Sequence, residues 1–151
     1  MVDDKRLTEL EIHRGDEVFL LGFPLSAQAP GGFPILRSAH IASYPLVPQK
    51  AVKQIELDVG LFGGNSGGPV YFWYSNRIYN NAMHVGEYQL GLLGLIIQTE
   101  NSTLPEYAGT SLNYGVVLPA QFIREAIDSL PPSPVSKAPT ATPDKSSAPL
   151  H

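Results

Sequence analysis

Six short apolar runs follow one another along the chain, and glycine, proline or asparagine bounds each of them. The runs are rich in valine, isoleucine, leucine, phenylalanine and tyrosine, which favour strands over helices. They are DEVFLLGF (16–23), FPILRSAHIASY (33–44), VKQIELDV (52–59), PVYFWY (69–74), YQLGLLGLIIQT (88–99) and LNYGVVLP (112–119). Six short strands joined by turns predict an all-β fold, a single antiparallel β-barrel that is closed or nearly closed.

The segments outside these runs are of three kinds. The polar segment 75–87 is expected to form a protruding hairpin loop. The segment PAQFIREAIDSL (119–130) has helical periodicity, with Pro119 suited to the first turn. Its predicted apolar face consists of Phe122, Ile123, Ala126, Ile127 and Leu130. Residues 131–151 are mostly proline, serine, threonine and alanine, so we expect a disordered tail.

Length and composition indicate one domain of ordinary size. The chain has 151 residues, of which 43% are hydrophobic, enough for a single core. We expect residues 1–13 to be an N-terminal lead-in, 14–130 to be the barrel with its closing helix, and 131–151 to be the tail. No signal peptide or membrane-spanning run is apparent, so the compartment is unknown and cytoplasmic by default.

Charge and residue types argue against several partners. A net charge of −4 gives no footprint for nucleic acid or for an anionic membrane, so we expect neither partner. The chain has no cysteine, which leaves no disulfide framework and no thiolate metal site. Its four histidines are scattered, so no metal and no cofactor are expected. The sequon NST at 101–103 is interpreted as a polar loop.

The segment GGNSGGP (63–69) places Ser66 between two pairs of glycines. A serine hydroxyl is a weak nucleophile, and it becomes useful when a rigid turn aims backbone N–H groups at the oxyanion that forms on attack. The plain alternative is a glycine-rich loop between two strands. A phosphate-binding loop fits less well, because the Gly-Lys-Ser/Thr ending is absent and a strand is predicted to follow.

The stretch around this motif resembles the trypsin-like (chymotrypsin-fold) serine peptidases, and GNSGGPV is similar to the nucleophile motif of their bacterial branch. The segment RGDEVFLLGFP (14–24) resembles the opening strand of the family's second barrel. IELDVGLFGGNSGGP (55–69) keeps an acidic residue, Asp58, eight places before the serine. The last strands and the closing helix resemble LGLLGLIIQ (90–98) and YGVVLPAQFIREAI (114–127). The resemblance covers roughly residues 14–130.

This resemblance implies roles for individual residues. Ser66 would be the nucleophile, and the backbone N–H groups of Gly64 and Ser66 would form the oxyanion hole. Gly60 stands where members that cleave after Lys or Arg carry Asp, which implies an apolar preference. The strand on which an extended substrate lies would be supplied by Leu95, Ile96 and Ile97. Asp58 would be structural, and Asn65 could not pair with a freed N-terminal amine as Asp does, so activation by that route is not expected.

The histidine base and its aspartate are missing from the resemblance. In the family both come from a first barrel, and MVDDKRLTELEI (1–12) resembles neither of the motifs that carry them. His40 faintly echoes the histidine motif, but it falls within a strand of the second barrel, and we expect His13 and His84 to be surface residues. We therefore expect a chain that is inactive alone and that needs a first β-barrel, in cis or missing from the gene model, to cleave a polypeptide.

Two hypotheses for the function stay open. One is a fragment of a serine endopeptidase that works through an acyl-enzyme on Ser66. The other is a non-catalytic peptide-binding module derived from such an enzyme. The intact glycine-serine motif favours the first, and the missing base favours the second.

Overall fold

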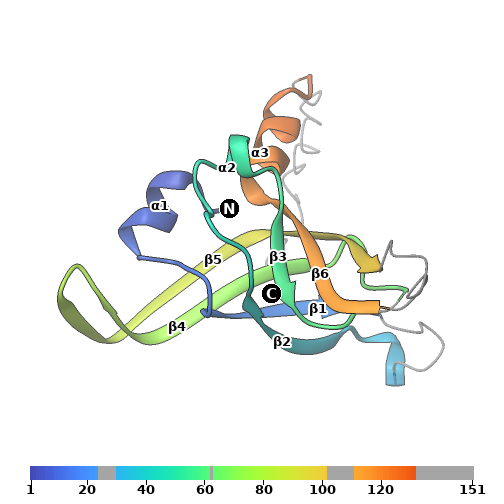
Figure 1. Ribbon diagram of the computed structural model, residues 1–151, viewed down its shortest axis with the longest axis horizontal. Helices are drawn as coiled ribbons and strands as arrows, with labels where there is room; N and C mark the ends of the chain where they lie inside the picture. The colour runs from blue at the N-terminus through green and yellow to red at the C-terminus, as the bar shows by residue number, and fades with distance from the viewer. Residues whose placement is uncertain (24–29, 62, 102–110, 132–151) are drawn as a thin grey trace, which may run out of the picture.

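The computed structural model describes residues 1–23, 30–61, 63–101 and 111–131 (Figure 1). The tail predicted to be disordered lies outside the described residues from position 132 onward. The polar loop predicted at the NST sequon also lies outside them after position 101.

The described elements include all six predicted strands and three α-helices. In chain order they are α1 (Asp4–Glu9), β1 (Glu17–Gly22), the 3₁₀ helix η2 (Pro30–Gly32), β2 (Ile35–Ile41), α2 (Gln49–Val52), β3 (Ile55–Asp58), β4 (Pro69–Tyr79), β5 (Ala82–Asn101), β6 (Ser111–Pro119) and α3 (Ala120–Asp128).

The six strands form one antiparallel sheet. Their order is β1-β2-β3-β6-β5-β4, and β4 pairs back with β1 through Tyr71 and Val70, so the order closes on itself. A mostly antiparallel sheet followed by a short C-terminal helix confirms the all-β prediction in its broad form.

Alternation of buried and exposed positions explains why these runs form strands. In β1 every second residue is buried, and Val18 and Leu20 are fully covered. Successive strand side chains point to opposite faces, so in β1 one face supplies the core and the other faces outward. The fully buried strand residues include Val18, Leu20, Ile55, Leu57, Val70, Phe72, Leu93, Val116 and Val117.

The segment 75–87 differs from its prediction. It is not a loop, because β4 continues to Tyr79 and β5 begins at Ala82. A two-residue turn joins them, and both of its residues, Asn80 and Asn81, have positive φ angles, 51° and 57°. Asparagine tolerates this conformation, which suits a two-residue hairpin turn. The hairpin protrudes from the rest of the sheet, at the left of Figure 1.

The N-terminal segment contains a helix that the sequence reasoning did not predict. The Asp3 side chain accepts a hydrogen bond from the Arg6 N–H at 2.8 Å and so caps the start of α1. Four apolar side chains of this segment are buried in the common core: Val2, Leu7, Leu10 and Ile12. Residues 1–13 therefore contribute to the core of the sheet.

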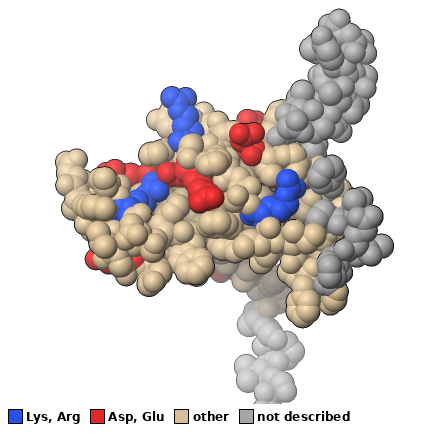
Figure 2. All heavy atoms as spheres, turned by 90° about the horizontal axis from the view of Figure 1, so that it is seen from below, with Lys and Arg blue, Asp and Glu red and all other residues tan. Residues whose placement is uncertain are grey.

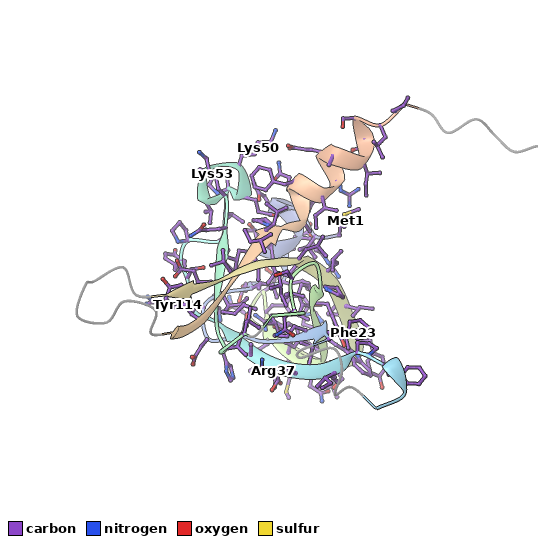
Figure 3. All side chains as sticks on the ribbon, turned by 90° about the vertical axis from the view of Figure 1, so that its right-hand side faces the viewer. Met1, Phe23, Arg37, Lys50, Lys53 and Tyr114 are labelled. Carbon is purple, nitrogen blue, oxygen red and sulfur yellow. The ribbon has the colours of Figure 1, made fainter. Side chains whose placement is uncertain are left out.

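Helix α3 confirms the predicted helix but not its whole apolar face. Ala120 is buried, and Phe122 and Ile123 are half-buried. Ile127 and Leu130, however, are 51% and 66% exposed, because the helix extends away from the sheet (Figure 3). Short polar contacts hold its base, among them an ion pair of 3.0 Å between Lys50 Nζ and Glu125 Oε1.

Candidate functional site

The serine loop, residues 63–68, connects the region after β3 to the start of β4. Gly64 and Gly67 have φ angles of 97° and 82°, a conformation that glycine adopts at little cost. Within the loop, Asn65 is 1% exposed while Ser66 points to the surface. The loop thus buries its asparagine and presents its serine.

Backbone hydrogen bonds attach this loop to two strands. On one side, the Phe23 N–H donates to the Gly64 carbonyl at 3.0 Å. On the other side, the Gly67 N–H donates to the Ile96 carbonyl at 2.7 Å, and the Ile96 N–H donates to the Gly68 carbonyl at 2.9 Å. The position of Ser66 is therefore fixed by main-chain bonds to the end of β1 and to β5.

Close packing explains two glycines at this site. A Cβ atom at Gly68 would lie 2.0 Å from the Leu21 carbonyl oxygen, and a Cβ atom at Gly22 would lie 2.3 Å from Asn65 Oδ1. Both distances are far shorter than a real contact allows. The serine loop and the end of β1 can approach this closely only because neither glycine carries a side chain.

Among the described residues, two N–H groups of the loop and the serine hydroxyl have no hydrogen-bond partner. The backbone N–H groups of Gly64 and Ser66 donate to no acceptor, in contrast to those of Gly67 and Gly68. The Ser66 side chain likewise makes no hydrogen bond within the described part of the chain. These three groups are available to a ligand.

A pocket of about 320 Å³ opens beside the serine. The loop forms one wall, and Pro34 and the end of β1, including Phe23, form the other. The walls are mainly backbone and apolar side chains: Leu21, Gly22, Phe23, Pro34, Gly64, Ser66, Gly67, Gly68 and Pro69. A small apolar group fits such a site best.

The predicted substrate strand is mostly occupied by the protein itself. The Ile96 side chain is 1% exposed, and both of its backbone groups bond to the serine loop. Leu95 pairs with Pro69 on one side and with Leu118 on the other. Ile97 lies at a register shift between β5 and β6 and is 43% exposed, so it is the most accessible of the three.

Gly60 is half-buried and has a partner that the sequence reasoning missed. Arg37 Nη1 donates a hydrogen bond to the Gly60 carbonyl at 2.6 Å. Arg37 shares its strand parity with the buried Ala39 and Ile41, so its side chain starts from the inward face of β2. The alternation along β2 could have indicated from the sequence that Arg37 points inward. Figure 3 shows Arg37 and Phe23 on the same side of the molecule, opposite Lys50 and Lys53.

Leu61 was also missed. It is 6% exposed, and its Cδ1 atom would lie 2.3 Å from a Cβ atom at Gly115. The residue next to Gly60 is therefore an apolar side chain packed against the glycine of β6. Leu61 therefore belongs to the core and does not line the pocket beside Ser66.

The histidines of the described residues lie far from the serine. Gly22 pairs with Ile35 next to the serine loop, whereas Glu17 pairs with His40 at the other end of the same two strands. These five positions correspond to about 17 Å along a strand. His40 is exposed, and its other register partner is the exposed Asp58 at the end of β3.

His13 and His84 make local contacts. The His13 side chain is 62% exposed, and its Nδ1 lies 2.9 Å from the Arg14 carbonyl oxygen. His84 was expected in a loop but lies in β5. Its Nδ1 is 3.2 Å from Glu87 Oε2, and its ring stacks on Tyr79. His84 pairs with Arg77, eight positions beyond Pro69, or about 27 Å along β4.

The charges of the described residues do not point to a metal or to nucleic acid. No group of three or more acidic or histidine side chains in the described ranges could hold a metal ion. On the face shown in Figure 2, the described lysine and arginine side chains are scattered among acidic ones and form no continuous basic surface. No helix in the described part of the chain is long and apolar enough to cross a membrane.

Comparison with known proteins identifies no relative. No family model, no curated protein and no solved structure matches the chain.

Proposed function

We propose that this chain is the nucleophile-bearing half of a trypsin-like serine endopeptidase, with its six-stranded sheet as the second barrel of a chymotrypsin-type double barrel. One observation carries the proposal. The exposed Ser66 hydroxyl lies on a loop in which the N–H groups of Gly64 and Ser66 have no acceptor among the described residues.

The proposed chemistry uses these groups in order. The Ser66 oxygen forms a bond to the carbonyl carbon of the scissile peptide while a base takes the hydroxyl proton. The N–H groups of Gly64 and Ser66 donate to the resulting oxyanion. The C–N bond then breaks as the base returns the proton to the leaving amine. Water hydrolyses the acyl-enzyme by the same steps in reverse.

The base must come from a first β-barrel that carries a histidine and an aspartate, in cis or on a separate chain. Loss of triad residues lowers turnover by about 10⁴ to 10⁶, and oxyanion stabilisation alone leaves a small residual rate. The 151-residue chain alone should therefore be inactive towards peptides.

Arg37 supports a preference for non-basic side chains before the scissile bond. The Arg37 guanidinium is bonded to the carbonyl of Gly60, so a cation already lies at the position where basic-specific relatives carry a carboxylate. A lysine or arginine of the substrate would meet repulsion and no counter-ion.

A second candidate is a peptide-binding module without catalysis. The position of the three described histidines favours it, since none lies near Ser66. In this case the pocket beside the loop would hold a peptide side chain, and the Ser66 hydroxyl would have no chemical role.

A serine-directed fluorophosphonate probe separates the two functions. The probe should label the purified chain slowly, imidazole added as a replacement base should accelerate labelling, and Ser66→Ala should abolish it. Ser129→Ala, a change in an exposed serine at the end of α3, is the matched control and should label like the wild type.

Three results would count against the peptidase. Absence of labelling at Ser66 with imidazole present favours the binding module. Peptide cleavage by the chain alone that His40→Ala stops would make His40 the base and refute the two-barrel arrangement. An in-frame stop immediately upstream of Met1 in the genomic DNA would weaken the hypothesis that a first barrel is encoded in the same chain.

A further inference from the structure

The β4–β5 hairpin extends beyond the closed part of the sheet. Strand β4 pairs with β1 only through Val70 and Tyr71, and β5 pairs with β6 only from Gly94 onward. Residues 72–79 and 82–91 therefore pair only with each other along most of their length. We call these two segments the arm; it is the protruding hairpin in Figure 1.

The two faces of the arm differ sharply. Its inner face packs against the N-terminal segment and carries the charged residues of the arm. Arg77 is bonded to Asp16, and Glu87 is bonded to His84. The opposite face, which we call the outer apolar face, consists of Trp73, Ile78, Met83, Val85, Tyr88 and Leu90, each 57–70% exposed.

Strand register pairs most side chains of the outer apolar face with one another, and the uncharged Asn76 lies opposite Val85. Trp73 lies opposite Leu90, and Ile78 lies opposite Met83. The rings of Trp73 and Tyr88 are 6.2 Å apart. No lysine, arginine, aspartate or glutamate of the arm belongs to this face, because Arg77 and Glu87 are its only such residues and both make contacts on the other side.

The size of this face matches what a dimer needs. Two aromatic and four aliphatic side chains at this exposure present on the order of 500 Å² of apolar surface. That is near the upper end for the largest patch on a monomer, about 300–600 Å². Two copies facing each other would cover about 1,000 Å² in total, roughly the lower bound for a specific interface.

We propose that a second copy of this chain covers the outer apolar face, and that two arms pack face to face around a two-fold axis. A two-fold interface brings the same surface of both subunits together. An uncharged face can do this without like-charge repulsion, whereas most charged surfaces of one chain repel their copies. The proposal is independent of the peptidase function, because the outer apolar face lies along β4 away from Ser66.

The mass of the full chain in solution tests the proposal. Sedimentation velocity between about 1 and 100 μM should show a concentration-dependent species with twice the mass of one chain. Ile78→Glu and Leu90→Glu each place a charge on the outer apolar face and should weaken dimerisation at least tenfold. Leu36→Glu, in a leucine of β2 that is 55% exposed, is the matched control and should leave the dimer intact.

Single cysteines locate the interface, because the chain has none of its own. Ile78→Cys should form a cross-linked dimer with a short bis-maleimide, whereas Leu36→Cys should not. Circular dichroism and thermal melting of each variant separate a lost interface from a lost fold. A monomer at 100 μM, an assembly that Ile78→Glu does not weaken, or efficient cross-linking through Leu36→Cys would each overturn the proposal.

Discussion

The serine loop and the arm lie at opposite ends of β4, and they are held in different ways. Main-chain hydrogen bonds and glycines fix the serine loop, and its exposed side chain contributes nothing to them. The arm is held by side-chain contacts on its inner face, chiefly the largely buried ion pair of Arg77 with Asp16 of the N-terminal region. A loop fixed by its backbone leaves a side chain free for chemistry, whereas a hairpin fixed by side chains can present its other face to a partner.

The largest effect is expected from Arg77, which binds the arm to the N-terminal segment. Its guanidinium donates two hydrogen bonds to Asp16, at 3.0 and 2.6 Å, and others to the carbonyls of Leu10 and Glu11. The side chains of Arg77 and Asp16 are both 12% exposed. Arg77→Met should therefore lower the free energy of unfolding by about 3–5 kcal/mol, because it leaves a buried carboxylate without its partner.

Two further variants sharpen this prediction in denaturant unfolding. Lys5→Met removes an ion pair with Glu9 in which the lysine side chain is 83% exposed, and it should change stability by less than about 0.5 kcal/mol. The double change Arg77→Met with Asp16→Asn should recover part of the loss, since no unpaired charge remains. Equal effects of Arg77→Met and Lys5→Met would show that side chains do not hold the arm.

A smaller effect is expected at the serine loop, and it depends on which glycine is changed. Gly68→Ala brings a methyl group against the Leu21 carbonyl and should cost about 1–3 kcal/mol. Gly63→Ala is the matched control, because a Cβ atom there meets no described atom within 4 Å. It should change the thermal midpoint little. If both alanines cost the same, close approach to β1 does not fix this loop.

The sequence predicted the sheet well, because alternation along the chain is a local signal. Val18 and Leu20 are spaced two apart, and glycines or prolines mark the ends of the runs. The serine loop was also recognised, since its glycines and Ser66 are contiguous.

The arm and α1 were missed because contacts distant in sequence stabilise them. Residues 75–87 are mostly polar and contain three asparagines, which locally favours a loop. Arg77 finds its partners more than sixty positions earlier. Helix α1 has only six residues, too few to be stable alone, and burial of Leu7 accounts for its formation.

The hydrogen bond between Arg37 and Gly60 was missed for the same reason, because the two residues are distant in sequence. The two residues are 23 positions apart, and only the pairing of β2 with β3 brings them together. The polar partner of a backbone carbonyl cannot be read from strand alternation, which places Arg37 inward but does not say what it meets. The base that the proposed peptidase would need is a different case, because neither His40 nor His84 lies near the serine loop.

The smallest effect on stability is expected from removing one hydroxyl group, that of Tyr74, from the inner face of the arm. The Tyr74 OH donates to the Glu17 carbonyl at 2.8 Å, and the Arg77 guanidinium lies 4.6 Å from the centre of its ring. Tyr74→Phe should lower the free energy of unfolding by about 1 kcal/mol at neutral pH. Tyr88→Phe, at an exposed position on the outer apolar face, is the matched neutral-pH control and should cost less.

Alkaline pH should then reduce the stability advantage of the wild type over Tyr74→Phe. Burial, and next the charge of Asp16, raise the pKa of Tyr74 above its usual value near 10. Above pH 10 the unfolded chain releases this proton while the folded chain retains it, so the wild type loses stability as pH rises. Phenylalanine has no such proton, and the stability difference measured by urea unfolding should shrink from pH 9 upward. A difference that stays constant to pH 11 would mean that the arm opens enough to hydrate Tyr74, and that its inner face is no more tightly held than its outer one.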